Sequence, residues 1–337
     1  MTAPPRLGIR LHGGIAPRRC VELAQAAESA GFWSAWFAEN PFDRGVMPAA
    51  AACAAATSRL RIGIGVFNPY NRHPTLIAME IGALDELADG RAALGIGSGI
   101  GGAVERMGLS YDRPIAAVRD AFAIIRPLLR GETATHDGPV FSAKDVKLGY
   151  PPPRPNLPLF MAARGDQSLR LCGRIADGLM ISNMCPRGFT EYAVEVMGDA
   201  ARAAGREAPP EIIQYVPCSI GSDHDAAVRS AKEALGAMLP GFWSLGIRFP
   251  AAKAAMLRGV IDEAEFTDAV GRLTDGEPAV QALDDRFVDQ FAVAGTAEEC
   301  LAKSADYAKA GVTELVFTIA GPSPPVGMAA LGALLKS

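Results

Sequence analysis

Eight short apolar segments alternate with segments of helical length along this 337-residue chain. Such near-continuous apolar runs are typical of parallel strands that are buried on both faces of a sheet. Eight strand–helix units in one α/β chain favour a closed (β/α)8 TIM barrel over a doubly wound open sheet. The predicted strands are residues 7–11, 32–38, 61–66, 92–96, 158–162, 178–181, 211–220 and 314–319.

The barrel is predicted to occupy the whole chain, residues 1–337, as a single domain, because no segment resembles a linker. Two irregular segments interrupt the pattern. Residues 131–158 lie between the fourth helix and the fifth strand, and residues 241–290 are expected to form short helices over the barrel end. We expect both insertions to shape a substrate pocket.

Composition narrows the class of protein. Hydrophobic residues make up 49% of the chain and charged residues 21%, which is typical of a well-buried soluble globule. The net charge of −4 gives no electrostatic footprint for nucleic acid or a membrane surface. Six scattered cysteines without C-x-x-C spacing predict a reducing compartment and no zinc site. With no signal-peptide pattern and no apolar tract long enough to span a bilayer, we predict a cytoplasmic protein.

Glycine-rich and polar residues follow the third and fourth strands, where parallel barrels bind their ligands. The sequence Gly97-Ser98-Gly99-Ile100-Gly101-Gly102 matches G-x-G-x-x-G literally. A dinucleotide fingerprint needs a helix opening at the third glycine of a first βαβ unit. Here three units precede it, and Gly108, Ser110 and Pro114 break the segment that follows. Two interpretations remain: a merely flexible loop, or a loop without side chains that lets a flat ring approach the backbone.

Polar residues also follow the first and second strands. Glu39 and Asn40 come directly after the second strand, so a carboxylate is expected at the barrel mouth, unless Glu39 is only a solvated turn acid. His12 faces the mouth if the strand alternation holds, with an open role. His73, before Pro74, is expected to cap a helix.

A candidate phosphate loop follows the fifth strand. Small residues and a helix start there, and free N–H groups at a helix N-terminus bind anions. The alternative is that Asp166 caps the helix with nothing bound. Asn183, after the sixth strand, lies on the neighbouring loop. The loop residues are Ala162, Ala163, Arg164, Gly165 and Asp166.

Several segments together resemble the luciferase-like monooxygenase superfamily of flavin- and deazaflavin-dependent (β/α)8 enzymes. The resemblance covers nearly the whole chain. Residues 65–74, Gly-Val-Phe-Asn-Pro-Tyr-Asn-Arg-His-Pro, are most similar to the coenzyme F420 branch, and within it to the methylenetetrahydromethanopterin reductases. The other carriers are AAESAGF (26–32), WFAEN (36–40), LDELADGR (84–91) and LGIGSG (94–99).

The resemblance implies F420 as the cofactor and a non-prolyl cis peptide, Gly65–Val66, behind its ring. It implies that Glu39 and Asn40 lie near the ring. We predict that both are catalytic residues, with Glu39 as the polar group nearest the ring. The resemblance also implies that Asn68 and the loop Gly97, Ser98 and Gly99 line the ring pocket, and that residues 162–166 hold the cofactor phosphate. The reductases carry an acidic residue on the first strand; here that strand is Leu-Gly-Ile-Arg-Leu. The substrate therefore stays open, with Arg10 and His12 as candidates for binding a different one.

Three hypotheses follow. The first is an F420-dependent oxidoreductase that transfers a hydride to or from a small organic substrate. The second is an FMN-dependent monooxygenase on the same scaffold, and the third is a non-catalytic flavin-binding relative. Phe42, Phe67, Tyr70 and Trp243 are candidates for apolar pocket walls or for core. The alanine-rich helix at 48–57 predicts packing on a partner, most simply in a homodimer.

Overall fold

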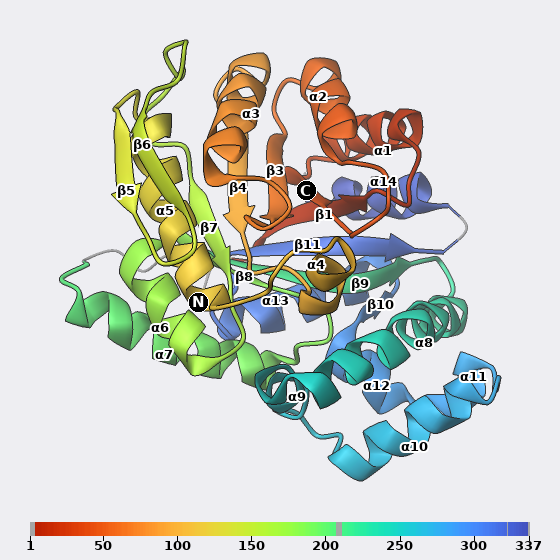
Figure 1. Cartoon of the computed structure of the whole chain (residues 1–337). Coiled ribbons are helices and arrows are strands. Elements are labelled where there is room, and N and C mark those ends of the chain that lie inside the picture. Colours follow the sequence, from red (N-terminus) through yellow and green to blue (C-terminus); the bar gives the residue numbers. More distant parts are fainter. Residues whose placement is uncertain (1–3, 207–210, 322, 336–337) are drawn as a thin grey trace.

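The computed structural model describes residues 4–206, 211–321 and 323–335 and contains a closed parallel barrel (Figure 1). The strand order is β9-β11-β1-β2-β3-β4-β7-β8, and pairing of β8 with β9 closes the ring. Each of the eight predicted strands is present, so the predicted barrel is confirmed. The barrel strands are β1 (Arg6–His12), β2 (Ser34–Ala38), β3 (Arg61–Phe67), β4 (Ala92–Ile96), β7 (Leu159–Ala162), β8 (Gly178–Ile181), β9 (Glu211–Ile220) and β11 (Glu314–Ala320).

Helices surround the barrel and cover the outer faces of its strands (Figure 1). Proline occupies the first turn of α1, α2, α3 and α5, where its missing N–H costs nothing and its fixed φ suits the helix. His73 caps α3 as predicted, and Thr296 and Glu299 form a capping box on α13. These helices are α1 (Pro17–Ser29), α2 (Met47–Ala56), α3 (Pro74–Leu87), α5 (Pro114–Leu129), α6 (Asp166–Ile175), α7 (Arg187–Ala203), α8 (His224–Arg248), α13 (Ala297–Lys309) and α14 (Pro324–Leu335).

Large side chains fill the middle of the barrel because glycines on β3 make room for them. Trp36 and Phe160 pack edge to face with ring centroids 5.5 Å apart. A Cβ on Gly63 would lie 2.6 Å from Trp36 Cζ3, and one on Gly65 would lie 2.5 Å from Met180 Cε. The β3 side of the barrel is thus thin, and its backbone lies directly against neighbouring side chains.

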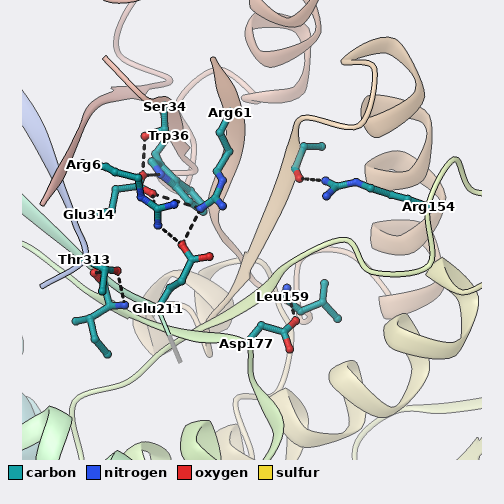
Figure 2. A network of polar contacts seen from close by, with 12 residues as sticks. Arg6, Ser34, Trp36, Arg61, Arg154, Leu159, Asp177, Glu211, Thr313 and Glu314 are labelled. Carbon is teal, nitrogen blue, oxygen red and sulfur yellow. Dashed lines mark hydrogen bonds and ion pairs between the residues drawn. The ribbon is translucent and has the colours of Figure 1, made fainter. Parts of the chain in front are cut away.

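A charged network closes the opposite, N-terminal end of the barrel. Glu314 is fully buried and accepts hydrogen bonds from Ser34 Oγ at 2.6 Å and Trp36 Nε1 at 2.5 Å. Arg61 Nη1 lies 3.3 Å from Glu314 Oε2 and 3.1 Å from Glu211 Oε2. Figure 2 shows these groups, with Arg6 also meeting Glu211. Because buried carboxylates need such partners, this network stabilises the fold at the end away from ligands.

The two insertions are more regular than the sequence indicated. Residues 131–158 contain a hairpin of β5 (Ala134–Asp137) and β6 (Ser142–Val146), and β10 (Val293–Gly295) adds to β9 outside the barrel. Helix α8 continues through Pro240 to Arg248, so the predicted start of the second insertion at 241 falls inside that helix. Short helices do follow: α9 (Pro250–Met256), α10 (Glu263–Thr274), α11 (Ala279–Ala282) and α12 (Asp285–Phe291).

The loop after β4 also differs from the prediction, because it contains a short helix, α4 (Gly101–Arg106), that begins one residue before Gly102, the third glycine of the G-x-G-x-x-G match. The helix ends before Gly108. It follows the fourth strand of a barrel and is not part of a dinucleotide-binding βαβ unit. Within the described residues, no helix is both long and apolar enough to cross a membrane.

Candidate functional site

The predicted site residues gather at one end of the barrel, because all its strands are parallel and each residue lies at or just after a strand's C-terminal end. Glu39 and Asn40 follow β2, and Asn68 follows β3. The glycine loop follows β4, the candidate phosphate loop follows β7, and Asn183 follows β8. The mouth has four parts, which differ in chemistry.

The first part is a surface in which glycine backbone predominates. We call it the backbone wall, and it comprises Gly65, Val66, Gly97, Ser98 and Gly99. The β3–β4 register shifts between Gly65 and Phe67, and the Gly65–Val66 peptide is cis, as the resemblance implied. Val66 leans across β4, so that a Cβ on Gly97 would lie 2.8 Å from Val66 Cγ2. The Tyr215 hydroxyl donates a hydrogen bond of 3.1 Å to the Gly65 carbonyl and supports the wall from behind. Only a residue without a side chain leaves such a surface flat.

Asn68 joins the β3 loop to the glycine loop. Its side chain is buried; Oδ1 accepts a 2.8 Å hydrogen bond from the Tyr70 amide, and Nδ2 donates one of 3.1 Å to Asn71 Oδ1. Gly99 has a φ of +76° and lies against the Asn68 amide. The Asn68 amide is thus used to shape the two loops around the wall.

The second part of the mouth is Glu39, which is half-buried and faces a cation. Its Oε1 lies 3.5 Å from Arg72 Nη1, and Arg72 Nε lies 3.1 Å from Glu80 Oε2. Burial raises the pKa of Glu39, and the charge and hydrogen bond of Arg72 only partly offset that rise. Asn40 lies next in the chain, but its amide donates to Asp43 Oδ2 at 3.0 Å. Glu39 therefore holds a proton at higher pH than an ordinary glutamate, whereas the Asn40 side chain is engaged in its own loop.

The third part is the candidate phosphate loop at the start of α6. Gly165 is the N-cap residue, with no side-chain cap, and Asp166 is the first helical residue. The alternative that Asp166 caps the helix is therefore wrong; its carboxylate instead accepts a 2.5 Å hydrogen bond from the Tyr192 hydroxyl. Without a side-chain cap, the first N–H groups of α6 are open to an anion.

Arg164 and Asn183 connect this loop to the one after β8. Arg164 Nη2 donates to the Asn183 carbonyl at 3.3 Å. The Asn183 side chain is buried, and its Oδ1 has no hydrogen-bond partner among the described residues. Ala162 and Ala163 at the end of β7 are small enough to let a ligand reach the helix. The two predicted loops are thus in direct contact.

The fourth part is a face on β1, β9 and β11, formed by Arg10, His12, Tyr215 and Thr318. Gly8 faces the interior against Val316, and Arg10, two residues further along β1, faces the same way. Burial and the nearby Arg10 charge lower the pKa of His12, whose Nδ1 accepts a 3.1 Å hydrogen bond from the Gly14 amide. Tyr215 and Thr318 were missed, although inward alternation along their strands was a usable signal.

The four aromatic candidates divide between core and surface. Trp243 stacks on Phe266 at 5.0 Å in a second core beneath α8, and Phe67 is fully buried with the Arg72 guanidinium 4.3 Å from its ring centroid. Tyr70 packs against Tyr111 at 5.1 Å. Phe42 is 60% exposed. Trp243 and Phe67 are thus core residues and not pocket walls.

The chain is similar over most of its length to proteins of known activity. The family model for luciferase-like monooxygenases matches residues 1–314. A 5,10-methylenetetrahydromethanopterin reductase of Methanolobus tindarius is 30% identical over 304 residues, covering 88% of this chain and 89% of that protein. An F420-dependent glucose-6-phosphate dehydrogenase of Microbacterium testaceum is 28% identical over 335 residues, covering 94% and 92%. The solved coenzyme F420-dependent tetrahydromethanopterin reductase of Methanopyrus kandleri superposes with a TM-score of 0.86 at 24% identity, covering 98% of both chains.

Proposed function

The chain belongs to the luciferase-like monooxygenase family, and we propose that it is an F420-dependent oxidoreductase that transfers a hydride between the deazaflavin and a small organic substrate. Support comes from its full-length similarity to relatives named as F420-dependent or as methylenetetrahydromethanopterin reductases. The observation that carries the proposal is the backbone wall lying in one barrel mouth with the uncapped start of α6.

The residues present suit the two ends of such a cofactor. The backbone wall, with Asn68 beside it, offers a flat surface for a tricyclic ring. The α6 N–H groups and Arg164 would donate to the phosphate. The open Asn183 Oδ1 would accept a hydrogen bond from a neighbouring hydroxyl group. Bound F420 supplies a ring carbon that carries a hydride, and the protein binds, orients and excludes water.

Glu39 is the proposed catalytic carboxylate. Because burial raises its pKa, it can hold a proton near the substrate and release it as the charge changes. Arg72, paired with both Glu39 and Glu80, positions the carboxylate and limits the rise in its pKa. The Asn40 amide would contact the ring only if its hydrogen bond to Asp43 were broken.

Titration of the apo-protein with F420 and with FMN tests the proposal. We expect an F420 dissociation constant of about 1 μM or lower, and FMN binding weaker by about 100-fold, or about 3 kcal/mol. Tight FMN binding without F420 binding would instead favour the FMN-dependent monooxygenase. F420 binding without electron exchange with any donor or acceptor would favour the non-catalytic relative.

Two further proposals concern the setting of the enzyme. Six buried free cysteines support a reducing compartment, the cytoplasm. Exposed Leu76, Met79 and Leu87 on α3 support packing against a second copy, so we propose a homodimer. Light scattering on the purified protein tests the dimer; a monomer at micromolar concentration would contradict it.

A further inference from the structure

Arg10 is a cation inside the barrel without an internal counter-ion. Its Nε is buried and has no hydrogen-bond partner, and no ion pair joins it to any carboxylate among the described residues. The interior arginine at the other end of the barrel, Arg61, is paired with both Glu211 and Glu314. Because a half-buried guanidinium without a counter-ion loses part of its hydration uncompensated, an unpaired one at a ligand site needs an explanation.

The surroundings of Arg10 supply no anion. The Arg10 guanidinium lies 5.6 Å from the centre of the Tyr215 ring, whose hydroxyl donates to Gly65. His12 supplies no anion either, because an imidazole is neutral or positively charged, and burial and the Arg10 charge lower its pKa. Glu39, the half-buried carboxylate of the mouth, is paired with Arg72.

A second unpartnered polar atom lies on the neighbouring strand. Ile9 of β1 pairs with Phe317 of β11, so the next residues, Arg10 and Thr318, sit side by side. Thr318 Oγ1 is buried and has no hydrogen-bond partner within the described part of the chain. A guanidinium and a hydroxyl that both lack partners form a donor pair suited to one carboxylate.

We propose that Arg10, assisted by Thr318, binds a carboxylate group of the substrate. This inference rests on the proposed function, because the ring of the cofactor would lie on the backbone wall. Tyr215 joins the Arg10 face to that wall through its hydrogen bond to Gly65. A carboxylate on Arg10 therefore places the rest of a small organic acid toward the wall. The substrate class is an organic acid, and its neutral analogues bind poorly.

Matched acids and amides test this inference. With F420-loaded protein, calorimetry compares cinnamate with cinnamamide and crotonate with crotonamide. These pairs differ in charge but little in shape. We expect the wild type to bind at least one acid about tenfold more tightly than its amide, or about 1.4 kcal/mol. This comparison needs no variant.

Variants then assign the preference to its residues. Arg10→Gln should remove the preference while F420 affinity stays within about twofold, and Thr318→Val should reduce it. Arg106→Gln removes an arginine that lies beside Phe42 instead, and it should leave the preference unchanged. A wild type without a preference for either acid, or an Arg10→Gln protein that keeps it, overturns the inference but leaves F420 binding intact. Failure of the wild type to bind F420 overturns the proposed function itself.

Discussion

Replacing Gly99 with alanine tests whether the glycine loop is shaped by Asn68. Gly99 has a φ of +76°, and Gly108, at the other end of α4, has the same φ of +76°. A Cβ on Gly99 would overlap Asn68 Nδ2 and lie 3.1 Å from Oδ1, whereas one on Gly108 meets no atom within 4 Å. Gly108→Ala is therefore a matched control with the same backbone cost and no contact.

The expected magnitudes follow from these contacts. The left-handed conformation costs an alanine about 1–2 kcal/mol at either position. At Gly99 the displaced Asn68 also loses hydrogen bonds to the Tyr70 amide and Asn71, each contributing about 0.5–1.5 kcal/mol. Gly99→Ala should thus lower the free energy of unfolding by about 2–5 kcal/mol, and Gly108→Ala by about 1–2 kcal/mol.

Urea unfolding gives the two free energies, and F420 titration gives the cofactor affinity. We expect Gly99→Ala to weaken F420 binding by about tenfold or more, because the backbone wall shifts with Asn68, and Gly108→Ala to leave it unchanged. Equal losses of stability in the two variants, with F420 affinity the same in both, would refute the argument that Asn68 and Gly99 shape the ring pocket together.

Three shorter predictions concern charged groups. Glu39→Gln should lower turnover more than F420 affinity and remove the limb of the pH–rate profile in which activity falls as pH rises through the raised Glu39 pKa; equal losses in both would contradict the catalytic role. Arg164→Met should weaken F420 binding by about tenfold through loss of the phosphate charge, and a titration with unchanged affinity would exclude the phosphate loop. Burial opposes ionisation of Glu211, but Arg61 and Arg6 hold its pKa below the ordinary value of 4.5, so its stabilising contribution is present above that pH and lost as pH falls through the folded pKa. Glu211→Gln should therefore flatten the acid side of the stability curve measured by thermal unfolding.

Sequence reasoning located the barrel because its signals are local. Apolar runs mark the eight strands, and the bounds predicted for β4, β8 and β9 match those observed. Some element bounds were predicted wrongly because packing between distant residues determines them. α8 continues through Pro240 because Leu239 and Trp243 pack in the second core on either side of it. The short α4 and the β5–β6 hairpin have too few residues to show a clear period.

The sequence predicted where the site residues lie along the chain, but not which side chains contact each other. Residues after strand ends are readable from order alone, and those positions do share one end of the barrel. The pairing of Glu39 with Arg72 and of Tyr215 with Gly65 depends on the strand register and on side-chain reach across the barrel. Neither follows from the spacing of the residues in the chain.

The two sides of the mouth differ in how they can change. The glycines of the backbone wall present main-chain atoms, so a substitution at Gly97 or Gly99 adds a Cβ that collides with Val66 or Asn68 and alters the surface itself. The Arg10 face consists of side chains on paired strands, where one substitution changes the charge without changing the register. A chain can therefore keep a planar cofactor while its substrate changes from one charge class to another. For this reason sequence similarity to F420-dependent relatives supports the cofactor more strongly than it supports any one substrate. The unpaired guanidinium is the better guide to the substrate that we propose.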